Sequence, residues 1–176
     1  NFKEGEILYI NKPYEWTSFG LVNKVRYFLC RKQGVKKLKV GHAGTLDPLA
    51  TGVMILCTGK ATKRIEEFQY HTKEYVATLQ LGATTPSYDL EHEIDATYPT
   101  EHITKELVEE TLKTFVGTIE QVPPSFSACK VNGKRAYDLA RKGKDVELKP
   151  KTLVIDEIEL LECRLPEIKI RVVCSK

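Results

Sequence analysis

The sequence predicts an α+β fold, with a mixed but mostly antiparallel sheet flanked by helices. Short apolar or alternating segments, which are typical of strands, interrupt segments that have the 3.6-residue period of amphipathic helices. The segments follow no regular strand–helix–strand repeat, so an all-parallel sheet is not expected. The 176 residues, of which 41% are hydrophobic, suffice for one globular domain with a core, or one domain with an excursion.

The N-terminal part is expected to begin with a strand and a helix. A short apolar strand is predicted at residues 7–10, and Ser18 is predicted to be the N-cap of the helix. Residues 53–58 form an apolar run that predicts a buried strand, and residues 60–68 are expected to form a short helix. The expected apolar face of the first helix comprises Leu21, Val22, Val25, Phe28 and Leu29.

The middle of the chain is expected to form a strand, a connection and a second helix. Residues 75–81 alternate between two faces, as a half-buried strand does. Residues 82–97 are expected to form a loop or hairpin. Residues 101–116 form an amphipathic helical pattern, and Gly117 is well placed to end that helix.

The C-terminal part is expected to contain two strands. Residues 121–130 are marked by two prolines and predict an extended segment, and residues 135–142 predict a short basic helix. Strands are predicted at residues 153–163 and 168–174, the second with clean alternation.

Charged residues are segregated along the chain, although the net charge is only +3. Residues 16–46 contain no acidic residue, residues 130–151 form a second basic run, and an acidic stretch at 89–110 lies between them. Such segregation attracts a polyanion, or it only solvates two faces, and composition leaves both readings open. The cations of the first run are Lys24, Arg26, Arg31, Lys32, Lys36, Lys37 and Lys39.

Several classes of protein are disfavoured by what the sequence lacks. No apolar run approaches the roughly 20 residues of a membrane span, and residues 1–6 lack the apolar core of a signal peptide. The five cysteines are scattered without metal-ligand spacing and indicate reduced thiols in a cytoplasmic protein. No histidine pairs with acids at metal-binding spacing, and no phosphate-binding glycine motif occurs. We therefore expect neither a metal nor a nucleotide cofactor.

One aspartate, Asp47, lies in a glycine-rich segment, GHAGTLDPLATGVM. An Asp-Pro pair favours a turn, and a loop carboxylate is also where catalysis often takes place, so both readings stay open. Small neighbours, such as Gly44 and Gly52, would let a flat substrate approach the backbone. His42 is expected to bind a phosphate or a base, or to satisfy the loop backbone. No serine or cysteine nearby has the setting of a nucleophile.

Other candidate site residues are distributed along the chain. Tyr75 is either a core aromatic or a stacking platform for an extruded base. Lys12, which precedes a proline, is expected to fix a loop beside the site or to lie in an ordinary turn. Lys130 and Arg141 are expected to hold phosphates, or to be solvated surface charges.

Five segments, in order along essentially the whole chain, resemble the bacterial tRNA pseudouridine synthases that act on the T loop, the TruB type. The first two segments resemble the family's Lys-Pro motif and its catalytic loop. The next two resemble its Lys-x-Tyr strand and its Ser-Ala-x-Lys block, and the last resembles the strand before its final catalytic motif. The segments are NKPYEWTSFGLVNKVR, GHAGTLDPLATGVM, KEYVATLQLGATTPSYD, QVPPSFSACKVNGKRAYDLARKG and RVVCSK.

The resemblance implies an isomerase that converts the uridine at position 55 of tRNA to pseudouridine. In the family an aspartate allows the glycosidic bond to break, and the uracil rotates and rejoins through carbon 5. No cofactor is implied, nor any protein partner, and the implied partner of a monomeric enzyme is the tRNA T stem-loop. Residues 1–176 would form the catalytic domain, without the family's last catalytic motif and C-terminal RNA-binding region.

The resemblance also implies roles for individual residues. Asp47 matches the essential aspartate, and Tyr75 matches the tyrosine that stacks on the flipped uracil. His42 matches the histidine that fills the space which the flipped base vacates. Lys12 matches the first motif and would support the loop, and Asp89 matches a position that pairs with a catalytic arginine beyond residue 176.

Three alternatives to this enzyme are considered. The first is a non-catalytic module that binds tRNA or helps it fold. The second is the guide-RNA-dependent relative of archaea and eukaryotes, against which the LATG after Pro48 favours the standalone bacterial type. A metal-dependent nuclease is disfavoured because no carboxylates cluster around Asp47 in the sequence.

Overall fold

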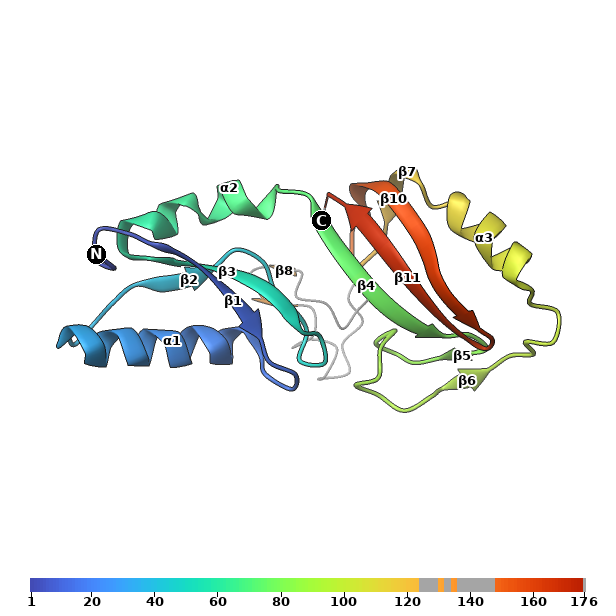
Figure 1. The fold of residues 1–176 in the computed structure, drawn as a ribbon, viewed down its shortest axis with the longest axis horizontal. Coiled ribbons are helices and arrows are strands. Elements are labelled where there is room, and N and C mark those ends of the chain that lie inside the picture. The colour runs from blue at the N-terminus through green and yellow to red at the C-terminus, as the bar shows by residue number, and fades with distance from the viewer. Residues whose placement is uncertain (124–129, 132–133, 136–147, 176) are drawn as a thin grey trace. The chain divides into compact units, whose positions relative to one another are not determined.

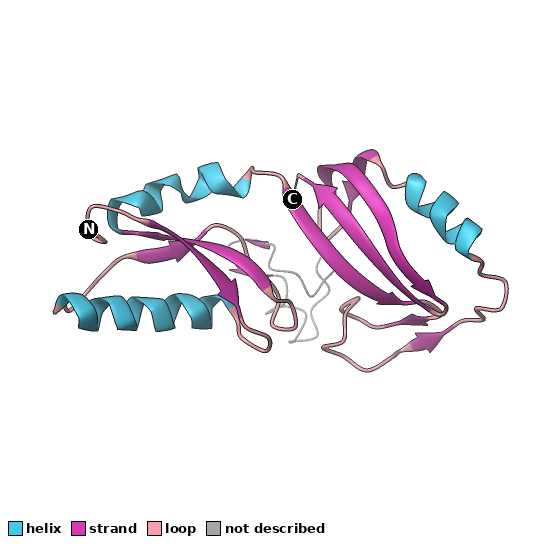
Figure 2. Ribbon diagram, viewed as in Figure 1, coloured by secondary structure: helices cyan, strands magenta, loops and turns pink. Residues whose placement is uncertain are grey.

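The computed structural model describes residues 1–123, 130–131, 134–135 and 148–175 (Figure 1). The chain divides into two compact units, Asn1–His71 (unit 1) and Thr72–Lys176 (unit 2), each with its own sheet and helices (Figure 2). Every described strand pair is antiparallel. The predicted α+β fold with a mostly antiparallel sheet is therefore confirmed.

Unit 1 is a three-stranded sheet with a helical layer on each side (Figure 1). The sheet order is β1-β3-β2, with β1 at Ile7–Lys12, β2 at Val40–His42 and β3 at Gly52–Thr58. Helix α1, Ser18–Gln33, covers one face. The predicted helix at 60–68 forms instead as a 3₁₀ turn, η1 at Gly59–Arg64, followed by α2 at Ile65–Gln69.

The core of unit 1 lies between α1 and the sheet. Leu21 and Val22 of the helix pack against Met54 and Leu56 of β3, and all four are almost fully buried. The prediction that Phe28 belongs to this apolar face is wrong, because its side chain is 60% exposed. Around the helix axis Phe28 lies about 20° from Leu21 but about 120° from Val22 and about 100° from Leu29, so it is at the edge of the buried stripe.

The N-cap of α1 is Thr17 and not Ser18 as predicted. Thr17 has extended backbone angles, and its hydroxyl accepts a hydrogen bond from the Gly20 amide at 3.0 Å. Ser18 is the first helical residue, and its buried side chain points into the unit. Two adjacent hydroxyl residues make the cap ambiguous in the sequence, since either one can accept from an amide of the first turn.

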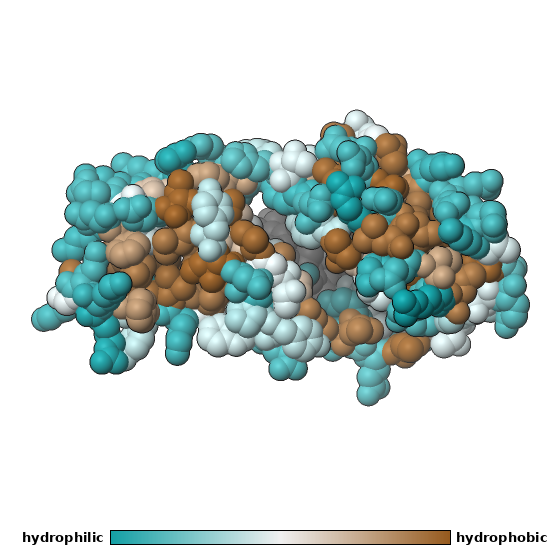
Figure 3. Space-filling model, viewed as in Figure 1, coloured by the Kyte–Doolittle hydropathy of each residue, from teal (hydrophilic) through white to brown (hydrophobic). Residues whose placement is uncertain are grey.

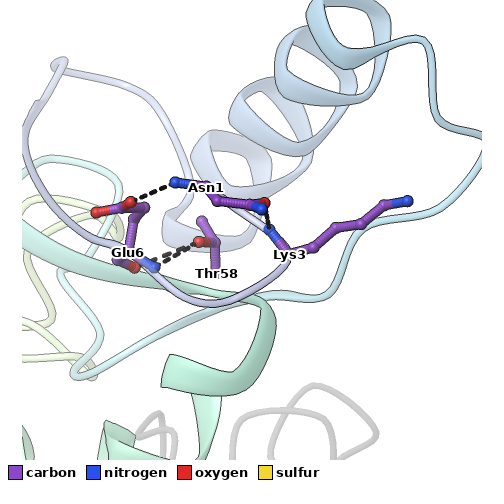
Figure 4. A network of polar contacts seen from close by, with 4 residues as sticks. All are labelled: Asn1, Lys3, Glu6 and Thr58. Atoms are coloured by element: carbon purple, nitrogen blue, oxygen red, sulfur yellow. Dashed lines mark hydrogen bonds and ion pairs between the residues drawn. The ribbon is translucent and has the colours of Figure 1, made fainter.

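The N-terminal segment is held against the end of β3 by a short network (Figure 4). The Asn1 amino group donates to Glu6 Oε1 at 2.7 Å, and the Glu6 amide donates to Thr58 Oγ1 at 2.9 Å. Next to it, Gly59 has a φ of +50°, and a Cβ there would lie 2.1 Å from the Lys3 carbonyl oxygen. Only glycine fits this close approach of two backbone segments.

Unit 2 is built on a four-stranded sheet with the order β4-β11-β10-β7. Its core joins Val108 of helix α3, Lys105–Lys113, to Ile168 and Ile170 of β11, so α3 covers one face. A short ladder, β5 with β6, forms the predicted hairpin region. The strands are β4 at Lys73–Gln80, β5 at Ala83–Thr84, β6 at Ala96–Thr97, β7 at Gly117–Gln121, β10 at Lys151–Arg164 and β11 at Glu167–Cys174.

Two helix predictions in unit 2 need correction. Helix α3 spans only Lys105–Lys113, shorter than predicted, because Thr104 caps its start and Thr114 ends it. Gly117, with a φ of +111°, begins β7 instead of ending the helix. Most of the expected extended segment at 121–130 and basic helix at 135–142 lies outside the described residues. Arg135 itself lies in β9, Lys134–Arg135, which pairs with β8, Lys130–Val131.

The described cysteines include free thiols, as the sequence predicts. Cys30, Cys57 and Cys163 are free thiols. Cys57 is fully buried in β3, and burial raises the pKa of its thiol. In the described part of the chain, no helix has the length and apolar character needed to cross a bilayer.

We expect Leu56→Ala to lower the free energy of unfolding by about 2 to 5 kcal/mol, because Leu56 is fully buried between α1 and the sheet. Val53→Ala in the same strand is the control. Val53 is 68% exposed, and its truncation should change stability by about 0.5 kcal/mol or less. Chemical denaturation measures both. Equal losses for the two variants would contradict the assignment of the core.

Candidate functional site

The Asp47 loop connects β2 to β3 in unit 1. The two strands pair directly, with His42 opposite Leu56, and the Ala43 amide donates to the Ile55 carbonyl at 2.9 Å, so the base of the loop is closed. At its tip the Ala50 amide donates to the Asp47 carbonyl at 3.0 Å, which makes the turn that the Asp-Pro pair predicts. Asp47 itself is exposed. The residue therefore lies in a turn and also faces solvent.

A buried lysine at the end of β1 anchors this loop. Lys12, at the end of β1, has no exposed surface, and its ammonium donates to three backbone carbonyl oxygens. The oxygens belong to Pro13 at 2.9 Å, Trp16 at 2.6 Å and Pro48 at 3.1 Å. The three bonds join the end of β1, the segment before α1 and the residue after Asp47. A charged donor strengthens each bond relative to a neutral one.

The pKa of Lys12 also depends on Asp47. Burial lowers the pKa of Lys12 below its usual 10.5, and the negative charge of Asp47 acts in the opposite direction and raises it. The Asp47 carboxylate is thus close enough to interact electrostatically with the buried ammonium. The sequence-based expectation that Lys12 fixes the loop agrees with these contacts.

Ser18 forms a second clamp, on the other side of Asp47. Its hydroxyl donates to the Leu46 carbonyl at 2.7 Å and accepts from the Leu46 amide at 2.9 Å. The Glu15 amide adds a bond to the Pro48 carbonyl at 2.9 Å. Leu46 is therefore fixed to the start of α1, and Pro48 to the end of β1 and the segment that leads into α1. The sequence alone does not predict this role of Ser18, because a serine at the start of a helix is typical of an N-cap.

The ring of His42 is turned back onto its own loop. It is half-buried, and its Nδ1 makes a short hydrogen bond with the Gly44 carbonyl oxygen. Because a carbonyl only accepts, Nδ1 carries the proton, and Nε2 is the nitrogen that can accept from another group. This contact matches the expectation that His42 satisfies the loop backbone, and it leaves one ring nitrogen for a further bond.

Tyr75 lies in unit 2, near the start of β4. It pairs with Val172 of β11, so both side chains lie on the sheet face that α3 covers. Tyr75 is still 40% exposed, because β4 is the outermost strand of this four-stranded sheet. The ring is thus part of an apolar face and also accessible from the side.

Asp89 organises the loop between β5 and β6 in unit 2. Its carboxylate Oδ1 accepts from the Ser87 hydroxyl and from the Glu91 amide at 3.0 Å. Its backbone carbonyl accepts from the Thr85 hydroxyl at 2.7 Å. The aspartate therefore acts as a local brace, and its second carboxylate oxygen is the one that can face another group.

The remaining predicted site residues are less fully described. Lys130 lies in strand β8, while Arg141 lies outside the described residues. Unit 1 brings Lys12, His42 and Asp47 into one loop system, and Tyr75 and Asp89 belong to unit 2. Among the described residues, no group of three His, Cys, Asp or Glu side chains is arranged to hold a metal ion.

Several known proteins are similar to this chain in sequence or in fold. Residues 31–176 match the family model described as TruB family pseudouridylate synthase (N terminal domain). The chain is 84% identical to the tRNA pseudouridine synthase B of Phocaeicola vulgatus, across all of this chain and 75% of that one. It is also 84% identical to the protein of the same name from Bacteroides fragilis, across 76% of its length.

A solved structure of a Cbf5–Nop10–Gar1 complex shares the fold. The match has a TM-score of 0.66 and 24% identity, and it covers 99% of this chain and 40% of that one. At this identity the likeness concerns the fold alone.

We expect Lys12→Met to lower the free energy of unfolding by about 2 to 4 kcal/mol, because three carbonyl oxygens lose their buried donor. Hydrogen exchange should also become faster at the Glu15 and Leu46 amides, which bond across the loop. Lys60→Met is the control, since Lys60 is exposed and forms a surface ion pair with Glu4. Unchanged protection of both amides would contradict the bracing role.

We also expect the stability difference between the wild type and Lys12→Met to depend on pH. Between the lowered pKa of folded Lys12 and the usual 10.5, the unfolded state binds more protons, so the contribution of Lys12 to stability rises with pH. The same contribution is lost as the pH falls through the lowered pKa. Denaturation from neutral pH toward pH 10.5 measures the difference, and a flat difference would contradict it.

Proposed function

The chain belongs to the TruB family of pseudouridylate synthases, and from this premise we propose that it isomerises a specific uridine of tRNA to pseudouridine. The substrate position we propose is uridine 55 in the T loop. The observation that carries the proposal is the Asp47 loop, in which an exposed carboxylate is held by clamps on both neighbouring residues. Such bracing keeps a reacting group in a fixed position, which is a large part of catalysis.

The proposed reaction moves one bond and needs no net oxidation. The bond between N1 of the uracil and C1′ of the ribose breaks, the detached uracil rotates, and a bond forms between C5 and C1′. The proton leaves C5, and N1 gains one, so the product is an isomer. Three routes use the same carboxylate: Asp47 attacks C1′, attacks the base, or removes a ribose proton to form a glycal. All three need one well-placed carboxylate and no metal.

The other site residues have proposed roles around this carboxylate. The accessible ring of Tyr75 supports stacking on the flipped uracil, with its hydroxyl available for proton transfer. His42 is proposed to occupy the space that the flipped base leaves, using the Nε2 that its loop contact does not engage. Lys12 positions the loop. Asp89 is proposed to pair with an arginine of the family's last catalytic motif.

The proposed partner is the T stem-loop of tRNA, and the proposed enzyme is a cytoplasmic monomer that uses no cofactor and requires no protein partner. Residues 1–176 are proposed to belong to its catalytic domain. Lys130 and Arg141 are proposed to bind phosphates, as part of the second basic run. Attraction of this kind weakens as the salt concentration rises. Selectivity for the proposed RNA is therefore expected to come from recognition of the shape of the folded loop.

We expect Asp47→Asn to reduce turnover by roughly 10⁴-fold or more while tRNA affinity and the fold are kept, because asparagine preserves shape and removes the reacting carboxylate. The assay is tritium release from a T stem-loop RNA that carries uridine labelled at C5. Asp156→Asn, at an exposed aspartate of β10, is the matched control and should keep full turnover. If neither wild type nor variant releases tritium although both bind the RNA, the chain is the non-catalytic binding module instead.

We expect Tyr75→Leu to slow turnover by roughly tenfold to a hundredfold, with Tyr75→Phe intermediate, because leucine removes the stacking ring and phenylalanine removes only the hydroxyl. Single-turnover tritium release measures the chemical step for each variant. A rate for Tyr75→Leu equal to that of the wild type would refute the stacking role.

A further inference from the structure

The outer side of α1 carries a stripe of cations and aromatic rings that the proposed reaction does not use. Lys24, Tyr27, Phe28 and Arg31 are spaced by three, four and seven residues, so they lie next to one another along the helix. All four are exposed, with Tyr27 and Phe28 at 61% and 60%. We call these four residues the α1 stripe.

The positive charge around this stripe is not neutralised. In the described part of the chain, no ion pair involves any of the seven cations between residues 16 and 46. Outside this run, six cations do pair with glutamates: Lys60, Arg64, Lys105, Arg164, Lys169 and Arg171. Hydrophilic side chains project from the α1 edge of unit 1 (Figure 3). An unneutralised basic surface favours a polyanionic partner.

One aromatic ring of the stripe, that of Tyr27, is held in place by a cation. The Arg31 guanidinium donates to the Tyr27 hydroxyl at 3.3 Å, and its Cζ lies 5.8 Å from the centre of the Tyr27 ring. Tyr27 thereby keeps one ring face next to a positive charge. Exposed rings beside cations are the combination that binds single-stranded nucleic acid, where bases stack on rings and phosphates meet cations.

The stripe starts close to the Asp47 loop. Helix α1 begins at Ser18, whose hydroxyl holds Leu46, the residue before Asp47. At 1.5 Å per residue, Lys24 lies about 9 Å and Arg31 about 20 Å along the helix from Ser18. A ligand bound at Asp47 and extending along α1 would therefore meet the stripe a few nucleotides away from the reacting one.

We propose that the α1 stripe is a second RNA-binding surface, which holds unpaired or loop nucleotides of the substrate outside the site of reaction. This inference rests on the proposed function, because it assumes an RNA substrate at Asp47. Lys24 and Arg31 contact phosphates, and Tyr27 and Phe28 stack on bases. The stripe contributes affinity and leaves the chemical step unchanged.

The first test removes the charges in the full-length protein. The variant Lys24→Gln/Arg31→Gln should bind full-length tRNA about tenfold more weakly at moderate salt, and the slope of log affinity against log salt should fall by about 1.5, as for two lost phosphate contacts. The control is Lys105→Gln/Lys113→Gln, two exposed lysines of α3 with the same loss of charge. Equal effects in the two double variants would mean a general charge effect and would overturn the proposal.

The second test removes the aromatic rings and keeps the charge. The variant Tyr27→Leu/Phe28→Leu should weaken tRNA binding about fivefold to tenfold with an unchanged salt slope, because stacking is lost and phosphate contacts remain. Unchanged affinity would overturn the stacking role. Circular dichroism and thermal unfolding check that each variant folds.

Tritium release separates this inference from the proposed function. Stripe variants should keep the wild-type turnover number at saturating tRNA, since none of the four residues touches the reacting atoms. The stripe proposal fails alone under three conditions together. The wild type releases tritium, the tRNA affinity of the charge variant equals that of Lys105→Gln/Lys113→Gln, and the affinity of the aromatic variant equals that of the wild type. If the wild type binds tRNA through the stripe but releases no tritium, the proposed function fails and the binding surface stands.

Discussion

The ammonium of Lys12 is the interaction on which the arrangement of unit 1 depends. A lysine with no exposed surface is costly unless its donors are used, and here they meet three backbone carbonyls. Those carbonyls come from two loops, the connection between β1 and α1 and the loop that holds Asp47. One buried charge therefore connects the end of β1, the start of α1 and the turn at Asp47. The carboxylate gains a fixed position without giving up its exposure to solvent.

Much of this fold is predictable from the sequence, and the reasons differ by element. The alternation of residues 168–174 predicts β11 because one face of a strand must be buried, and the structure buries Ile168, Ile170 and Cys174. The glycine-rich loop and its aspartate are equally visible in the sequence. Phe28 and the length of α3 are not, because a helical period alone does not say how wide the covering sheet is or where a threonine will cap.

The site is predictable in its residue types and only partly in its contacts. The sequence indicates Asp47, His42 and Lys12 as residues in motifs, but not that Lys12 bonds the Pro48 carbonyl 36 positions away. The two hydrogen bonds between Ser18 and Leu46 join residues 28 positions apart, and no local sequence pattern predicts them. The roles of Tyr75 and Asp89 depend on partners beyond their own loops and strands, and the reaction itself is a proposal that rests on family membership.

The burial of Cys57 gives unit 1 a built-in reporter of its own opening. Its thiol has no exposed surface and a raised pKa, so an alkylating reagent meets almost no thiolate while β3 is covered. Modification at this position then proceeds only through states in which the sheet has opened, and its rate measures their population. Cys30 on α1 is half-exposed and lies beside Arg31. Among the described residues, Cys57 thus offers a slowly reacting thiol that reports core fluctuations, and Cys30 offers a more accessible thiol to which a probe can be attached.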